Sequence, residues 1–177
     1  MRPDLDQWLP EPQVRTRHHR SAASSPERLW AAAQTVQVRD APVLGRVLRW
    51  RIPGTSPDVS FRELLRQYPF TVLDEGERWS VSGLCGRIWT LQRYYPHLAG
   101  AGDFAAWREP GTVRVVIAHW VGPGAGGRPA LFSESRVEPV DRGAGLRLRA
   151  LWAIVGRFER LVGREVLRAA ARCAERS

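Results

Sequence analysis

The clearest pattern of apolar and polar positions lies in the last third of the chain. Residues Thr112–Val121 and Pro129–Val140 alternate between the two kinds of position, which is typical of β-strands. In Gly145–Glu175, apolar residues recur every three or four positions, which predicts one helix of roughly 30 residues. Such a helix would be about 45 Å long, whereas helices average ~11–12 residues. The pattern therefore predicts a sheet wrapped around a long terminal helix, an arrangement that often leaves a cavity between the two.

The same signals predict shorter elements upstream. An irregular lead-in that contains several prolines, residues 1–12, precedes a polar edge strand expected at residues 13–20. Ser25 before Pro26 indicates the start of a helix that runs to about Gln34, because serine is a good N-cap and proline suits the first helical position. Two further short helices are expected, one opening at Pro42 and one over Ser60–Gln67.

Beyond residue 67 the apolar period changes to two, which predicts four more strands. They are Phe70–Asp74, Arg78–Ser82, Arg87–Leu91 and Asp103–Arg108. A loop is expected at Gln92–Ala101, and strands that are joined by short turns should pair antiparallel. The expected fold is a single α+β domain over residues 13–177, with about seven strands in a curved sheet. Gly83 and Gly86 are the expected bends, because glycines inside strand patterns often mark bulges.

Composition is that of an ordinary globular protein. The chain has 177 residues, of which 44% are hydrophobic and 25% charged. No apolar run approaches the ~18–20 residues of a membrane span, and the first residues lack the apolar core of a signal peptide, so we expect a cytoplasmic protein without integral membrane association. The net charge of +9 comes from arginine alone and is spread along the chain, which favours compositional bias over a nucleic-acid site. Cys85 and Cys173 lie in no metal-ligand spacing and are expected to be small buried residues, and no metal or cofactor is expected.

Four short motifs occur in a fixed order in the second half of the chain. They are Gly-Leu-Cys-Gly-Arg-Ile-Trp at 83–89, Phe-Ala-Ala-Trp-Arg-Glu-Pro-Gly at 104–111, Ser-Glu-Ser-Arg-Val at 133–137 and Leu-Trp-Ala-Ile at 151–154. Together with the order of elements, they resemble a branch of the SRPBCC superfamily that is common in actinobacteria. The superfamily includes START domains, birch-pollen allergens and polyketide cyclases. The resemblance implies a helix-grip fold with a hydrophobic cavity and usually ligand binding, while catalysis occurs only in some relatives.

His119 is the first candidate for chemistry. The odd positions of Thr112–Val121 are the more uniformly apolar ones and are expected to face inward, so His119 should point into the cavity at the end of an apolar stripe. Histidine titrates near neutral pH and could hydrogen-bond a ligand or act as an acid or base. The alternative is a core histidine whose hydrogen bonds are satisfied by a neighbour.

Glu134 and Arg136 share one face of their strand. If that face is inward, the two must pair, because an unpaired buried charge costs several kcal/mol, and they could orient a polar ligand group. If it is outward, they form a surface pair worth roughly 0–1 kcal/mol. Alternation alone leaves both orientations open.

The terminal helix carries an apolar stripe and a basic face. The stripe, expected to grip the sheet, is Leu148, Leu151, Trp152, Val155, Phe158, Val162, Val166, Ala169, Ala170 and Cys173. The opposite face carries Arg149, Arg157, Arg160, Arg164, Arg168 and Arg172. A basic helix face can lie on anionic lipid, but a solvated charged face is the commoner outcome.

Enzyme signatures are absent from the sequence: it has no nucleophile elbow, phosphate loop or zinc spacing. The leading hypothesis is a monomer or homodimer that binds a small hydrophobic molecule, lipid or polyketide-like. A cyclase or aromatase-type enzyme using the same pocket, and a ligand-free interaction or stress-related domain, are the alternatives. The residues expected to line the site are Phe70, Trp89, Trp107, Ile117, His119, Glu134, Arg136, Leu151, Trp152 and Val155.

Overall fold

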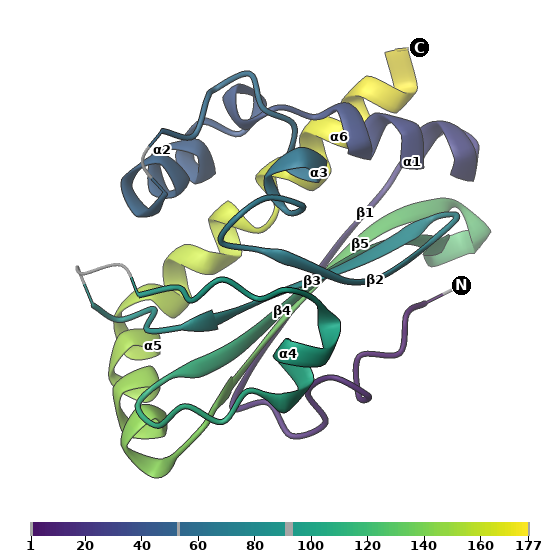
Figure 1. The fold of residues 1–177 in the computed structure, drawn as a ribbon. Helices are drawn as coiled ribbons and strands as arrows, with labels where there is room; N and C mark the ends of the chain where they lie inside the picture. The colour runs from purple at the N-terminus through teal and green to yellow at the C-terminus, as the bar shows by residue number, and fades with distance from the viewer. Residues whose placement is uncertain (1, 53, 91–93, 177) are drawn as a thin grey trace.

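One open antiparallel sheet organises the molecule, seen in a computed structural model that describes residues 2–52, 54–90 and 94–176, without the side chains of 51 and 157–162 (Figure 1). Within those residues the sheet has five strands in the order β1-β5-β4-β3-β2. The strands are β1 (Val14–Ser21), β2 (Thr71–Gly76), β3 (Trp79–Gly86), β4 (Val113–Pro123) and β5 (Pro129–Pro139). All four pairings are antiparallel, so the fold is α+β, and the sheet does not close into a barrel.

Six α-helices accompany the sheet in the described part of the chain. They are α1 (Pro26–Thr35), α2 (Pro42–Arg51), α3 (Phe61–Leu64), α4 (Ala101–Ala106), α5 (Arg142–Val162) and α6 (Glu165–Arg176), with short 3₁₀ turns at Val38–Asp40 and Ala125–Gly127. The predicted start of α1 is confirmed, since the Ser25 side chain accepts a hydrogen bond from the Arg28 backbone and Pro26 is the first helical residue. At α3, Ser60 and Glu63 cap each other's backbone amides in a capping box.

The number of strands is smaller than the sequence patterns predict. Residues 103–108 do not form a strand, since most of them belong to α4. An apolar run as short as Phe104–Trp107 does not distinguish a strand from a helix by its periodicity. The predicted strand Arg87–Leu91 is also not formed: Arg87 makes only an isolated bridge to Tyr94, residues 88–90 lie outside strands, and Leu91 lies outside the described residues.

Glycine explains where β3 ends. Gly86 has φ +146°, and a Cβ there would lie 2.0 Å from the Tyr94 carbonyl oxygen, so the chain turns away from the sheet at a position that only glycine suits. At Gly83, the other position where a bend was expected, β3 continues without a register shift in its pairing with β4. The register shift is instead on β2, between Val72 and Asp74.

The single long terminal helix is also not observed. Gly163 and Arg164 form a turn between α5 and α6, at a glycine that weakens a continuous helix. Of the predicted apolar stripe, Leu148, Val166 and Ala170 are buried, and the side chains of Phe158 and Val162 lie outside the described residues.

The sheet is covered on both sides. On one side, which we call the helix face, Val121 and Leu131 pack against α1 and α6, while Val113, Val115 and Val137 pack against Leu148 of α5. On the other side, the N-terminal face, Val81, Val116 and Trp120 pack against Leu5, Leu9 and Phe104 of α4. Residues 2–12 of the lead-in form no regular helix or strand, and Leu5 and Leu9 within them are fully buried. This segment is therefore part of the core.

Glu134 and Arg136 fasten the lead-in to the N-terminal face. Both side chains are essentially unexposed, and Arg136 Nε donates to Glu134 Oε1 at 2.9 Å. Arg136 Nη1 also donates to the Leu9 carbonyl oxygen at 2.7 Å and to Asp6 Oδ1 at 2.5 Å. Burial acts to raise the pKa of Glu134, but hydrogen bonds from Arg136 and Arg15 outweigh it and hold that pKa below its ordinary value. The hydrogen-bonding groups of Glu134 and Arg136 therefore find their partners within the chain.

Replacing Arg136 tests this fastening. We expect Arg136→Met to lower the free energy of unfolding by about 3 kcal/mol, because it removes the central partner of a buried carboxylate. The matched control is Arg39→Met, whose partner Asp58 lies 2.8 Å away in an exposed pair, and we expect it to cost at most about 1 kcal/mol. Urea denaturation of both variants measures the difference, and equal losses would contradict the structural role of Arg136.

Candidate functional site

A band of polar side chains crosses the middle of the otherwise apolar helix face. Strand register places His18 beside Ser133, Ser133 beside His119, and His119 beside Ser80, so that one polar residue comes from each of β1, β5, β4 and β3. The row alongside contains Thr16, Ser135, Ile117 and Ser82. Polar groups on a covered face need hydrogen-bond partners, either within the chain or from a bound molecule.

Two polar side chains of the band are hydrogen-bond partners of each other. His119 Nε2 and Ser133 Oγ lie 3.2 Å apart, within hydrogen-bond distance. Burial lowers the pKa of His119 to about 4, so its imidazole is neutral near neutral pH. Among the described residues, by contrast, the hydroxyl groups of Ser80 and Ser82 form no hydrogen bond.

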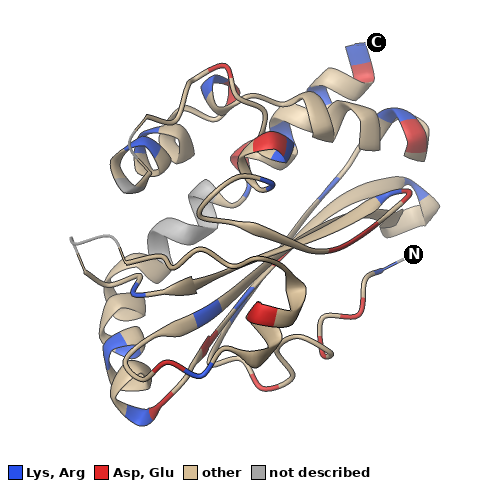
Figure 2. Ribbon diagram, viewed as in Figure 1, with Lys and Arg blue, Asp and Glu red and all other residues tan. Residues whose placement is uncertain are grey.

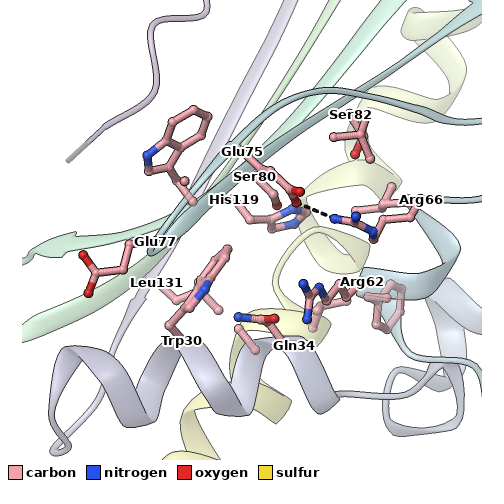
Figure 3. A pocket seen from close by; sticks show the side chains of 17 residues that line it. Trp30, Gln34, Arg62, Arg66, Glu75, Glu77, Ser80, Ser82, His119 and Leu131 are labelled. Carbon is pink, nitrogen blue, oxygen red and sulfur yellow. Dashed lines mark hydrogen bonds and ion pairs between the residues drawn. The ribbon is translucent and has the colours of Figure 1, made fainter. Parts of the chain in front are cut away.

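A cavity of about 340 Å³ lies between this band and helices α1, α3 and α6 (Figure 3). Ser80, Ser82 and His119 line it from the sheet. Its apolar walls are Trp30 and Ala33 of α1, Phe61 of α3, Leu65, Leu131 and Val166. Trp30 and Ala33 have helical spacing on α1, and Ser80 and Ser82 alternate along β3, so the pattern of each element turns these side chains toward the same space.

Charged and amide side chains surround the cavity on the α3 side and at the β2–β3 hairpin. Arg62 and Arg66, four positions apart, both line it, as do Gln34 of α1 and Glu75 of β2 (Figure 3). Arg66 is ion-paired with Glu75. Arg62 forms no ion pair with any residue that the structure describes, and it therefore offers an available cation next to an apolar cavity.

The structure separates the predicted site residues into three groups. Only His119 lines the cavity, and its inward orientation is confirmed. A second group, on the helix face at the end of the sheet near α5, is an apolar cluster that includes Phe70, Trp89, Ile117 and Trp152. Leu151 and Val155 lie on α5, partly buried, and do not line the cavity either.

The third group lies on the N-terminal face. The Trp107 indole N–H donates to Thr112 Oγ1 at 2.9 Å, and its ring packs against the cluster that contains Phe104. Glu134 and Arg136 lie on this face as well, which settles the orientation that alternation left open. These three residues do not meet the cavity on the helix face.

Sequence patterns do not single out most of the residues that line the cavity. Trp30, Phe61 and Arg62 come from short helices, where an apolar or basic residue suggests only a core or surface position. Ser80 and Ser82 can be recognised as candidate site residues only from the strand register, which places them beside His119 and Ile117. One signal was available: serines at alternate positions of β3 share a face, and that face turns out to be covered.

Three further features of the described part of the chain bear on its chemistry. No group of three His, Cys, Asp or Glu side chains is placed there to hold a metal ion. No helix among those residues is both long and apolar enough to cross a bilayer. Cys85 is buried, and burial raises the pKa of its thiol to about 12, so it is a poor nucleophile.

Comparison with known proteins assigns no family. No protein-family model matches the chain, and no curated protein matches it. Among solved structures, it is similar to the crystal structure of TTHA0849 from Thermus thermophilus, with 12% sequence identity and a TM-score of 0.35 over 91% of this chain and 97% of that one. A likeness of this size carries no argument about function.

The lowered pKa of His119 predicts a dependence of stability on pH. In the unfolded chain this histidine takes up a proton near its ordinary pKa of 6.5, whereas in the fold it does so only at about 4. Stability is therefore lost as pH falls from about 6.5 through about 4. In His119→Gln, the loss between about pH 7.5 and about pH 5 should be smaller than in the wild type by about 2 kcal/mol.

Urea denaturation at the two pH values measures this difference. The matched control is His97→Gln, which removes an exposed imidazole outside the cavity. If both variants changed the pH dependence to the same extent, burial of His119 would not be its cause.

Proposed function

We propose that the protein binds a small, largely hydrophobic molecule in the cavity between the sheet and helices α1, α3 and α6, as a helix-grip protein of the SRPBCC type would. The observation that carries the proposal is the cavity itself. Its volume of about 340 Å³ falls at the low end of the ~300–1,000 Å³ of ligand sites, and its walls are mainly apolar with a few converging polar groups. A ligand-free domain with a filled cavity is the less favoured alternative for the same reason.

The polar groups indicate the chemistry of the ligand. Ser80 and Ser82 offer hydroxyl groups with unused hydrogen-bonding capacity, and His119 is a neutral imidazole. These groups suit an uncharged oxygen, such as a hydroxyl or a carbonyl, better than a charged group. Arg62 provides a cation that suits an acidic end. A lipid or polyketide-like molecule with a few oxygen atoms has this character.

A cyclase or aromatase-type activity is the second candidate, and the presence of His119 on the cavity wall is the observation that favours it. A group with a pKa of about 4 is a weak general base near neutral pH, so the binding function is preferred. His119→Gln separates the two, because it should abolish turnover if the histidine is the catalytic base and only weaken binding otherwise.

Filling the cavity tests the binding function. Ala33→Phe should place a ring in the space beside Trp30 and reduce affinity for the bound molecule by about tenfold or more. Ala31→Phe, an exposed position on the same helix, is the matched control and should leave binding unchanged. Native mass spectrometry identifies any molecule that co-purifies, and calorimetry with fatty acids, sterols and aromatic polyketides gives affinities. The proposal fails if the delipidated wild type binds none of them, or if both variants bind equally well.

A further inference from the structure

Helix α2 is apolar on two faces. Its inner face packs Leu44 and Leu48 against the core cluster that contains α1 and α6. Its outer face exposes Val43, Val47 and Trp50, which are 40%, 41% and 60% exposed and recur at intervals of four and three residues. Three large apolar side chains along one exposed helix face form a coherent patch, unlike the single exposed apolar residues that any protein shows.

The charge on α2 has one sign. Arg46 and Arg49 are exposed, and the helix from Pro42 to Arg51 contains no acidic residue. Figure 2 shows blue and no red along α2. Basic residues beside an exposed tryptophan and valines are typical of helices that lie in the interface of an anionic bilayer, where the apolar side chains enter the acyl boundary and the guanidinium groups meet phosphate.

The orientation of α2 is fixed by contacts at its start. The Glu165 carboxylate, from the first turn of α6, accepts hydrogen bonds from the backbone amides of Val43 and Leu44 at 3.4 and 2.9 Å. This charge also stabilises the helix N-terminus. Together with Leu44 and Leu48 on the inner face, it keeps the apolar and basic outer face turned away from the core.

We propose that the outer face of α2 docks the protein on an anionic lipid surface. Tryptophan suits this position because its ring favours the boundary between hydrocarbon and headgroups. A second copy of the chain is a poorer occupant, because a two-fold contact would bring Arg46 and Arg49 of one protomer against the same residues of its partner. Nucleic acid would engage the arginines but would leave the apolar stripe without a role. The docking does not depend on what the cavity binds.

Vesicle binding tests the docking. The full-length protein should co-sediment with vesicles of phosphatidylcholine and phosphatidylglycerol, and not with vesicles of phosphatidylcholine alone. Arg46→Gln with Arg49→Gln should weaken binding roughly 30-fold, and Trp50→Ala should weaken it about tenfold. Because Arg46 and Arg49 are exposed, the variant with both changes should keep the wild-type circular dichroism spectrum and melting temperature. The circular dichroism spectrum of Trp50→Ala checks that this variant is folded.

The matched control is Arg168→Gln with Arg172→Gln, which removes the same charge from exposed positions of α6. It should retain wild-type binding. The proposal is overturned if the control loses as much affinity as the α2 pair, since adsorption would then follow net charge alone. It is equally overturned if the wild type ignores anionic vesicles, or if Trp50→Ala converts a dimer to a monomer in sedimentation equilibrium without changing vesicle binding.

Discussion

Burial of the central sheet on both faces is the constraint on which the rest of this structure depends. Along β4, Val113, Val115 and Val121 face the helices, while Val116 and Trp120 face the N-terminal segment, and all are buried. A strand covered on both sides must supply apolar side chains at nearly every position. The N-terminal residues belong to the fold for this reason, because Leu5 and Leu9, together with Phe104 of α4, cover one face of the sheet.

Polar residues on such a sheet need a specific reason to be there, and the two faces differ in the reason. On the N-terminal face, Arg136 donates to Glu134, Asp6 and the Leu9 carbonyl, so its hydrogen-bonding capacity is used within the chain. On the helix face, Ser80 and Ser82 line the cavity, and their hydroxyl groups have hydrogen-bonding capacity that no described residue uses. A buried pair whose hydrogen bonds are all made within the chain indicates a structural role, whereas the unsatisfied hydroxyl groups beside the cavity are the basis of the proposed ligand site.

Sequence patterns predicted the parts of the fold that local chemistry determines. The start of α1 follows from Ser25 and Pro26, and the inward side of β4 follows from its apolar odd positions. The strand expected over residues 103–108 is wrong, because six residues are too few for the apolar pattern to distinguish a strand from a helix. The terminal helix divides at Gly163, and the continuous apolar stripe gives no sign of this break. The cavity was harder still to predict, because it depends on register between strands far apart in sequence: Ser80 meets His119, and His119 meets Ser133, only through pairing.

The arginines of this chain differ in their surroundings, and their surroundings determine what each guanidinium group can bind. All of its basic residues are arginine, so composition gives each of them the same meaning. Arg136 is buried and fully bonded, and it acts as a fastening. Arg62 borders the cavity without an ion-pair partner among the described residues, where a guanidinium can meet an acidic group. Arg46 and Arg49 stand beside exposed apolar side chains with no acidic residue on their helix, where the same group suits a phosphate surface. The net charge of +9 therefore does not by itself locate a binding site for an anionic group. The arginines that have no acidic partner in the described part of the fold are the better guide.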